Sequence, residues 1–600
     1  MSCVALSTSP SALRTLPTVL VALAAVACSS GASPGAPDAD AGDAGAMDAE
    51  LPDDAAPIED LAPPVDLGPP DPFADELPWE PCALFTGSST PGALCLTWPL
   101  PLRHDDPDGP SIDVFIKRIP GGGRGQLWLL QGGPGGVSAY MESNGRNWGR
   151  AVGYDAYIVE HRGVGRSTRL GCAEEEARES EEGYRITPEE FGPCVDAAFS
   201  QFGESAFEAL TSVTEAARDL GALMELFREP EDPRFLYGVS YGTYWGSRFL
   251  QIFPELVDGA ILDSICGPGG CGFPLRFDVG FDEIGREVLA ACAEDEACAA
   301  LFETDDPYAE ALEALQSFDT RCPIAAGGRT TAMDIRGGLG FLLTNRNTRR
   351  AVPAALRMAA RCAVEDQRGL RFFGDLLFPE NPTVWPDDVA RLRSDLLFHG
   401  VVRSELQDDP VLTPEGYAER LETLVFRGGG RRDVELYRAT LNALPRIAPD
   451  PVNFGRVPET TRPVLMLNGA LDPQTPPSVG RSLFEVLTGP HKYYVEMPRA
   501  THVVANTNCG RNLVLGFLRD PLAEPNTGCL DDLDAIDFSD NADLARAYFG
   551  LETLYPEEEP AETARSAIVD LEAVEALRDL AREWVRGGPA FRAGLTVAAP

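Results

Sequence analysis

Residues 235–246 read FLYGVSYGTYWG, and this stretch decides the fold. An apolar, aromatic run ends in Gly-Val-Ser-Tyr-Gly, which places the polar Ser240 between Gly238 and Gly242. A strand that feeds a helix through such a motif predicts a sharp turn that holds one hydroxyl group out of the fold, as nucleophilic catalysis by serine requires. The motif alone is weak, because at a content of 59 glycines chance supplies it roughly once in every few chains of this length.

The flanking sequence strengthens this interpretation. Between residues 126 and 264, short buried-strand patterns alternate with helical patterns, which is typical of a parallel sheet flanked by helices. Strand patterns return after a long helical interval. We therefore predict an α/β fold, a mostly parallel sheet flanked by helices with an inserted helical region, whose strands lie in these stretches: 126–136, 154–168, 234–240, 257–264, 462–477 and 491–504.

The chain of 600 residues is too long for one ordinary domain, and its composition changes along its length. We find no internal repeats. The expected organisation is a signal peptide, an acidic Pro/Ala/Asp-rich tether, the first part of the α/β core, the helical insertion, the second part of the core and a helical extension: 1–27, 28–80, 81–265, 266–457, 458–530 and 531–600.

The N-terminus has the features of an export signal. Arg14 precedes the apolar run LPTVLVALAAVAC, and no Lys or Arg follows before Arg103. The run is too short to span a membrane and ends in small residues. Its AAVAC ending resembles a bacterial lipoprotein signal, which implies lipidation of Cys28 and a location in the bacterial cell envelope. The alternative is cleavage near Ala27 and plain secretion.

The charge balance bears on partners. The chain has 50 Lys and Arg against 93 Asp and Glu, a formal charge of −43. Phosphate binding needs clustered cations, so nucleic acid is not expected as a partner. We expect a peptide or small-ester substrate, no cofactor, no metal, and membrane contact only through the N-terminal lipid. The sequence leaves the oligomeric state open.

The cysteines favour disulfides. Twelve follow Cys28, an even number, and their spacing does not form a paired C-x2-C zinc site. Cys292 and Cys298 would lie on opposite sides of an unbroken helix, so they pair only if the helix breaks between them. Near-sequence candidates are Cys82 with Cys95, Cys172 with Cys194, Cys266 with Cys271, and Cys509 with Cys529.

The predicted fold orders its catalytic residues as nucleophile, acid and histidine. His502 is the candidate base, because it lies in a loop after the last predicted strand. Asp472 follows the preceding strand in a loop shaped by prolines and is the candidate acid; Asp263, at the end of an earlier strand, is the second choice. The other histidines are less suitable by position: His104, His161, His399 and His491.

Attack on a carbonyl group creates an oxyanion that needs two preplaced N–H donors. The amide of Tyr241, directly after the nucleophile, is one candidate. The other is expected from the loop QGGPGG, because glycines allow the backbone to approach a substrate closely. Gly133 is the candidate donor in that loop.

Five stretches together resemble the α/β-hydrolases of the prolyl aminopeptidase and secreted tripeptidyl aminopeptidase group: QGGPGG, EHRGVGRST, YGVSYGTYWG, LNGALDPQTPP and THVVANTNC. Members are serine peptidases that remove residues from peptide N-termini. The likeness spans roughly residues 81–530, including the Cys509–Cys529 pair. It implies Ser240 as nucleophile, Asp472 as acid and His502 as base, which are the same residues chosen from position.

This chain also departs from that group. Gln131 stands where the prolyl enzymes usually have His, and Glu160-His161-Arg162-Gly163 replaces their Asp-Gln-Arg-Gly. The tail beyond Asp531 lies outside the pattern. The leading hypothesis is an envelope-anchored serine exopeptidase. A carboxylic ester hydrolase with the same triad is the alternative, and a binding protein on an inactive scaffold is a third.

Overall fold

A computed structural model describes residues 77–556, except for 173, 178–179, 181–184, 230, 268–270, 323–329, 378–388, 390, 431 and 533–534. The central feature is a nine-stranded sheet in the order β1-β2-β3-β5-β4-β6-β7-β8-β9. The strands from β4 to β9 run parallel to one another, and β1, β2 and β3 form an antiparallel edge. This mostly parallel sheet flanked by helices confirms the predicted α/β-hydrolase fold.

The strand bounds are as follows: β1 Glu80–Ala83, β2 Pro91–Pro101, β3 Ser111–Ile119, β4 Gln126–Leu130, β5 Asp155–Val159, β6 Arg234–Val239, β7 Gly259–Asp263, β8 Val464–Gly469 and β9 Lys492–Met497. Every residue of β4, β5, β6, β7 and β8 is buried, as expected for parallel strands covered on both faces. Successive side chains enter opposite layers, so that Leu127 and Leu129 pack on one face while Trp128 and Leu130 pack on the other.

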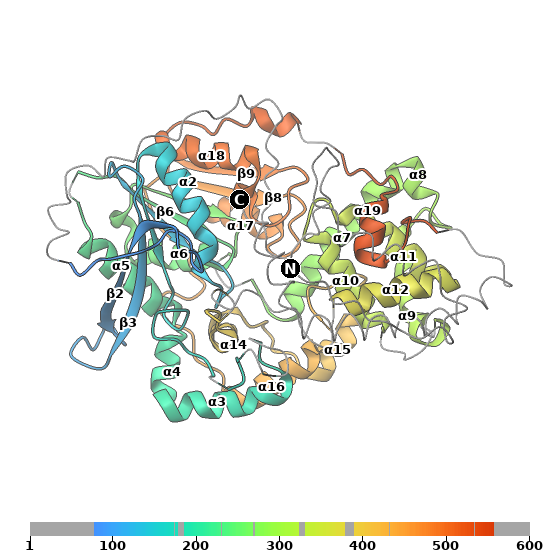
Figure 1. The fold of residues 1–600 in the computed structure, drawn as a ribbon, viewed down its shortest axis with the longest axis horizontal. Coiled ribbons are helices and arrows are strands. Elements are labelled where there is room, and N and C mark those ends of the chain that lie inside the picture. Colours follow the sequence, from blue (N-terminus) through green and yellow to red (C-terminus); the bar gives the residue numbers. More distant parts are fainter. Residues whose placement is uncertain are drawn as a thin grey trace, which may run out of the picture. The chain divides into compact units, whose positions relative to one another are not determined.

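Helices cover both faces of the sheet (Figure 1). The helices α2 (Glu142–Val152) and α18 (Asn508–Arg519) pack beside each other on the Leu127 face. The helices α5 (Val213–Leu226) and α6 (Tyr241–Ile252) pack on the Trp128 face. The remaining helices outside the β7–β8 interval are α3 Pro188–Phe202, α4 Glu204–Leu210, α17 Pro477–Val486 and α19 Ala542–Leu544.

The interval between β7 and β8 is mainly helical in its described residues. Its helices are α7 Leu275–Glu294, α8 Glu296–Ala299, α9 Pro307–Arg321, α10 Ala332–Leu343, α11 Val352–Arg361, α12 Val364–Leu377, α14 Asp395–Val401, α15 Pro414–Leu421 and α16 Asp433–Ala443. Shorter helical turns along the chain are η1 Ser138–Met141, η2 Pro254–Leu256, η3 Arg349–Ala351, η4 Val402–Leu406, η5 Val504–Asn506, η6 Gly528–Asp532 and η7 Ala545–Phe549.

The insertion packs in two parts. Apolar residues of α14 and η4 join the core cluster under α5 and α6. The helices α7 and α9 to α12 form a second core of their own. Phe538, Tyr548 and Phe549, which follow the complete sheet in the sequence, also belong to this second core. The described part of the C-terminal extension therefore completes the insertion, a role that sequence patterns did not predict.

Six disulfides join cysteines of the described residues, and they include the four near-sequence pairs and Cys292–Cys298. The sixth joins Cys322 to Cys362. The break that Cys292–Cys298 requires occurs at Asp295, where α7 ends and a side-chain cap begins α8. Six disulfides are typical of a protein outside the reducing cytoplasm.

The expected signal peptide, Cys28, nearly all of the tether and the amphipathic helix expected within the tail lie outside the described residues. Among the helices of the described part, none is both long and apolar enough to cross a membrane.

Candidate active site

Ser240 lies at a strained turn between β6 and α6. Its φ of 56° and ψ of −127° put a non-glycine residue in an unfavourable region of backbone space. The turn is held from both sides, because the Ser240 amide donates to the Asp263 carbonyl at 2.9 Å and the Ser240 carbonyl accepts from the Thr243 amide at 2.8 Å. The sequence motif thus forms the sharp elbow that it predicted.

Close backbone approach explains the glycines around the elbow. A Cβ on Gly238 would lie 2.4 Å from the Gly242 carbonyl oxygen, and one on Gly242 would lie 2.3 Å from the Leu130 carbonyl oxygen. A Cβ on Gly132 would lie 2.7 Å from the Ser240 Cβ. Each of these contacts is shorter than carbon atoms tolerate, so the elbow requires glycine at all three positions.

His502 and Asp472 form a hydrogen-bonded pair. The His502 Nδ1 lies 2.8 Å and 3.0 Å from the two Asp472 carboxylate oxygens. Since a carboxylate only accepts, the proton lies on Nδ1, and Nε2 keeps its lone pair. The Asp472 side chain is fully buried, whereas that of His502 is 12% exposed. This arrangement suits His502 for taking a proton through Nε2.

The Asp472 carboxylate is fixed by its own loop. One oxygen accepts from the amides of Gln474 and Thr475 at 2.9 Å and 3.1 Å, and the other accepts from the Thr475 hydroxyl at 2.7 Å. An aspartate that caps the amides two and three residues on is a recognised turn. Thr475 was not identified from the sequence as a residue that orients Asp472. The Asp-Pro-Gln-Thr sequence, which is typical of this turn, could have indicated it.

The pKa of His502 lies above its ordinary value of 6.5. Burial acts against the imidazolium and lowers the pKa, but the charge of Asp472, its hydrogen bond and the more distant charge of Asp263 together outweigh burial. The site therefore stabilises the imidazolium that forms when His502 accepts a proton.

Asp263, the second-choice acid, has a different set of contacts. It is fully buried and accepts from the amides of Val504 and Ala505, both at 2.9 Å, and from the Tyr237 hydroxyl at 2.8 Å. Burial raises the pKa of Asp263, and these donors and His502 oppose the rise. The carboxylate therefore braces the loop that follows His502, while Asp472 bonds to the imidazole itself.

The same strand end connects the two sides of the site. The Asp263 carbonyl accepts from Ser240, and the neighbouring Ser264 hydroxyl accepts from the Val503 amide at 2.7 Å. Within the described residues, no hydrogen bond joins the Ser240 Oγ to His502. Catalytic hydrogen bonds are often long in unliganded enzymes and tighten when substrate binds.

The two candidate oxyanion donors lie at the ends of two adjacent strands, β4 and β6. Gly133 lies in the loop after β4 with φ of 125°, and Tyr241 begins α6. No acceptor among the described residues receives the amide hydrogen of either one. Both amides can therefore donate to a developing oxyanion.

The Tyr241 side chain makes a contact that the sequence did not predict. Its hydroxyl lies 3.2 Å from the His161 Nε2, and the His161 Nδ1 lies 2.6 Å from the Arg162 carbonyl oxygen. Burial lowers the pKa of His161 to about 4. The ring is therefore neutral, donates through Nδ1 and accepts the Tyr241 hydroxyl hydrogen.

The other histidines have contacts elsewhere. The His104 Nε2 bonds to Asp219, and His399 packs against Phe191 and Phe398. His491 is half-buried next to β9. Of the five histidines, the described structure pairs His502 with the candidate acid Asp472.

The insertion lies directly on the glycine loop. The Ser394 amide donates to the Gly135 carbonyl at 3.1 Å, and a Cβ on Gly135 would meet the Ser394 carbonyl oxygen at 2.2 Å. Glu405 of η4 accepts from the Tyr244 hydroxyl at 2.7 Å and pairs with Arg248 at 2.7 Å, and both partners lie on α6. The insertion therefore contacts both the predicted oxyanion loop and the elbow helix.

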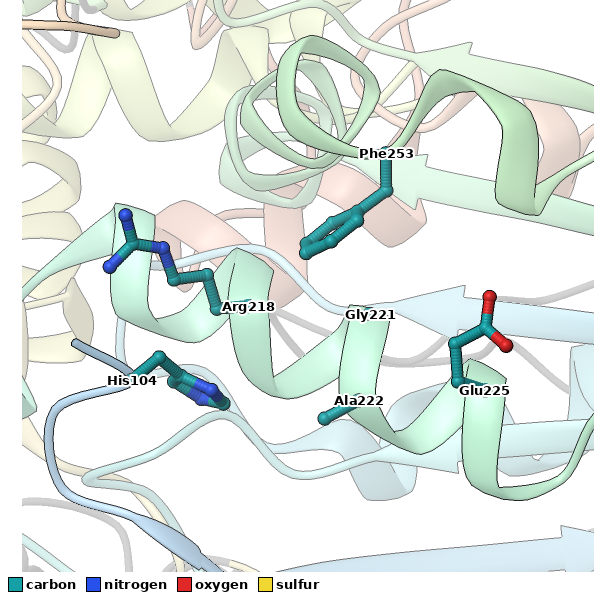
Figure 2. A pocket seen from close by; sticks show the side chains of 6 residues that line it. All are labelled: His104, Arg218, Gly221, Ala222, Glu225 and Phe253. Atoms are coloured by element: carbon teal, nitrogen blue, oxygen red, sulfur yellow. The ribbon is translucent and has the colours of Figure 1, made fainter. Parts of the chain in front are cut away.

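A separate surface pocket of about 240 Å³ lies beside α5 (Figure 2). It is lined by His104, Arg218, Gly221, Ala222, Glu225 and Phe253. Phe253 caps the end of α6 opposite Ser240, so this pocket lies roughly 18 Å along the helix from the elbow. No group of three or more His, Cys, Asp or Glu in the described ranges is arranged to hold a metal.

The TAP-like protein family matches residues 443–529. This segment contains Asp472 and His502 but does not include Ser240. The chain is 29% identical over 253 residues to serine protease Hip1 of Mycobacterium tuberculosis, covering 37% of this chain and 46% of that protein. It is 29% identical over 210 residues to tripeptidyl aminopeptidase of Streptomyces coelicolor, covering 32% and 38%. The matches thus span less than half the length of these relatives.

Among solved structures, the chain is similar to a Paleococcus ferrophilus monoacylglycerol lipase, with 16% identity, a TM-score of 0.30, and coverage of 68% of this chain and 99% of that one. The nine-stranded, mostly parallel sheet gives the chain an α/β-hydrolase fold, and the chain is similar to a serine protease and to a tripeptidyl aminopeptidase over part of its length.

Proposed function

We propose that this protein is an exported serine peptidase that releases residues from the N-termini of peptides through an acyl-enzyme on Ser240. The observation that carries the proposal is the His502–Asp472 pair, at 2.8 Å, next to a strained serine elbow. The partial similarity to a serine protease and to a tripeptidyl aminopeptidase supports a peptide substrate.

In the proposed mechanism, the Ser240 Oγ attacks the scissile carbonyl while the His502 Nε2 takes its proton. The amides of Gly133 and Tyr241 stabilise the oxyanion. His502 then donates the proton to the leaving amine, and the acyl-enzyme remains. Water repeats the sequence, with His502 again as base, and releases the N-terminal fragment. Asp472 stays ionised throughout and stabilises the imidazolium.

A panel of substrates tests this proposal. The wild-type protein should cleave aminoacyl or peptidyl chromogenic amides that carry a free N-terminus, and acetylation of that N-terminus should abolish cleavage. Ser240→Ala should lower kcat by several orders of magnitude while leaving the circular dichroism spectrum and the melting temperature close to wild type.

A serine-reactive phosphonate probe separates the alternatives. Labelling of the wild type but not of Ser240→Ala, together with turnover of short-chain esters and not of amides, would make the protein a carboxylic ester hydrolase. Absence of labelling on folded protein would contradict a catalytic role for Ser240 altogether.

The proposal includes export and an N-terminal lipid anchor on Cys28. The six disulfides support export. Cys28→Ala should move the protein from the membrane fraction to the soluble fraction without changing kcat, and a chain that starts near Asp75 should be soluble and active. A wild-type protein that fractionates as soluble with an unmodified Cys28 at its N-terminus would replace the anchor with plain secretion.

A further inference from the structure

Three phenylalanines of the insertion form an aromatic row: Phe398, Phe273 and Phe277. The Phe398 ring on α14 lies 5.3 Å from the Phe273 ring, edge to face, and the Phe273 ring stacks at 4.7 Å on the Phe277 ring of α7. Both geometries are ones that aromatic rings favour. Each of the three residues is only half-buried. The aromatic row therefore presents apolar surface that the described residues leave partly uncovered.

The aromatic row lies where the two cores meet. Phe273 and Phe398 pack against the edge of the core under α5 and α6, and Phe277 packs against the second core. The next ring along α7, that of Phe281, lies 5.1 Å from the Phe277 ring and is 2% exposed. Burial is thus complete one turn further along the helix but not within the row. A contiguous apolar surface that stays partly exposed is typical of an interaction site.

One end of the aromatic row lies on the predicted oxyanion loop. The amide of Ser394, the residue that caps α14, donates to the Gly135 carbonyl at 3.1 Å. The Phe398 amide nitrogen lies 3.5 Å from the place that a Cβ on Gly135 would take. Gly135 comes two residues after Gly133, the candidate oxyanion donor. Phe398 is therefore held beside the loop that would bind the oxyanion.

The other end of the aromatic row lies one helical turn from the loop of the catalytic acid. Gly280 follows Phe277 by three residues on α7. A Cβ on Gly280 would lie 2.8 Å from the Pro476 Cγ and 3.0 Å from the Pro473 carbonyl oxygen, so α7 packs directly on this loop. Asp472 precedes Pro473 in the sequence. The aromatic row thus extends from the oxyanion loop toward the Asp472 loop.

The sheet order assigns the Phe398 end to one side of the substrate. In the order β4-β6-β7-β8-β9, the glycine loop after β4 and the His502 loop after β9 lie on opposite sides of Ser240, which follows β6. His502 donates its proton to the leaving amine, so the leaving part of the peptide lies toward β9. The acyl part lies toward β4, where Phe398 contacts the glycine loop.

We propose that the aromatic row binds the side chain of the substrate residue that acylates Ser240. This inference rests on the proposed function and specifies its substrate class: peptides in which the residue directly before the scissile bond has a large apolar side chain, above all an aromatic one. Such a side chain completes the burial of rings that the protein leaves half-covered, and contacts between rings add to the gain from burial.

The test uses matched substrates that carry a free N-terminus and differ in one residue. Aminoacyl and tripeptidyl chromogenic amides have phenylalanine or alanine directly before the scissile bond, and matching esters carry the same acyl groups. The wild type should act on the phenylalanine substrates with a kcat/KM about 10- to 100-fold above that for the alanine substrates. Peptides with phenylalanine or alanine directly after the scissile bond should differ by less than about threefold.

Phe398→Ala should lower the ratio of kcat/KM for phenylalanine over alanine substrates by at least about fivefold, because it removes the ring beside the oxyanion loop. The ratio compares two substrates on one variant, so a smaller fraction of folded protein does not change it. Phe398→Leu keeps an apolar side chain and should retain part of the preference. If Phe398→Ala does not fold, Phe398→Leu and Phe273→Leu provide the test.

Phe484→Ala is the matched control. Phe484 is also half-buried and packs against an aromatic ring, that of Tyr494 at 5.7 Å. The Lys492 ammonium, at the first residue of β9, lies 4.7 Å from the centre of the Phe484 ring. This end of the strand is opposite the end that leads to His502, so Phe484→Ala should leave the ratio unchanged.

Four outcomes decide between the inference and the function on which it rests. Equal rates of the wild type on phenylalanine and alanine acyl groups would overturn the inference. A ratio that folded variants of both Phe398 and Phe273 keep, or a preference found only after the scissile bond, would also overturn it. Turnover of esters without amides would contradict the peptidase function, while the ester ratio would still test the aromatic row. No turnover of either series would overturn both.

Discussion

The Ser240 side of the candidate site is built from backbone, whereas the His502 side is built from side chains. Around Ser240, three glycines let the main chain pack at distances that exclude a Cβ, and the elbow is held by backbone hydrogen bonds. Around His502, two buried carboxylates do the positioning: Asp472 bonds to the imidazole, and Asp263 holds the loop that follows.

This difference teaches how each side should respond to substitution. A turn built from closely packed backbone tolerates no added atom at its glycines. Removal of a side-chain charge should affect it little, because no charged side chain holds it. A loop built from carboxylates responds to the loss of a charge, and the response depends on which group the carboxylate contacts. The predictions below test this contrast.

Asp472→Asn should have the largest effect. Asparagine fits the space, but its amide no longer stabilises the imidazolium, and it permits the wrong His502 tautomer. We expect kcat to fall by about 10³- to 10⁴-fold with little change in melting temperature. Steady-state kinetics beside thermal melts measure both quantities. A loss below tenfold would show that Asp472 is not the acid.

Gly132→Ala tests the backbone side. The new Cβ would lie 2.7 Å from the Ser240 Cβ and 3.0 Å from the Val239 carbonyl oxygen, so the loop or the elbow must move. A displacement of about 1 Å at reacting groups lowers rates by roughly 10²-fold, which is the expected loss in kcat.

Gly192→Ala in α3 is the matched control, because its Cβ meets no atom within 4 Å. It should keep wild-type kcat. If Gly132→Ala also kept it, the glycine loop would not be part of the site.

The sequence predicted the parts of the fold that depend on local patterns. The strands from β4 to β9 and the helix after Ser240 follow from buried runs and helical spacing near glycine turns. The antiparallel strands β1, β2 and β3 were not predicted, because their residues are only partly buried and lack the continuous buried runs of β4 to β8. The packing of Phe538 and Phe549 on the insertion depends on tertiary contact in the same way.

For the candidate site, too, the sequence predicted the residues that follow strands but not their backbone contacts. The order of Ser240, Asp472 and His502 along the chain, each after a strand, was enough to choose them. The bracing role of Asp263 was not predictable, because it rests on the amides of Val504 and Ala505, and backbone amides leave no mark in sequence.

Asp263→Asn should reveal that bracing role. Asparagine turns one acceptor oxygen into a donor that faces the amide of either Val504 or Ala505 in a fully buried site, because the two amides donate to different oxygens of Asp263. We expect a loss of roughly 2–3 kcal/mol in the free energy of unfolding and about a tenfold fall in kcat. Denaturant titrations and kinetics measure these. A larger loss of kcat than in Asp472→Asn, at unchanged stability, would transfer the role of acid to Asp263.

The pH dependence of kcat/KM follows from the raised pKa of His502. The base must be neutral to accept a proton, so activity should fall tenfold per pH unit below a midpoint that lies above 6.5. Asp263→Asn should move this midpoint down only slightly, because Asp263 contributes less than Asp472 to the raised pKa. A wild-type midpoint below 6.5 would contradict the electrostatics described for the site.

Tyr241→Phe should have the smallest effect, since it removes a hydroxyl group behind the elbow and leaves the Tyr241 amide in place. The Nε2 of His161 loses its donor in a buried site, and we expect a loss of about 1 kcal/mol in the free energy of unfolding and a fall in kcat of less than tenfold.

His161→Phe should give a similar loss in the free energy of unfolding, because it leaves the Tyr241 hydroxyl without its acceptor. In a double-mutant cycle, the pair should lose less than the sum of the single changes, since both remove one interaction. Additive losses would mean that the two side chains act on the elbow separately and that this hydrogen bond does not hold Tyr241.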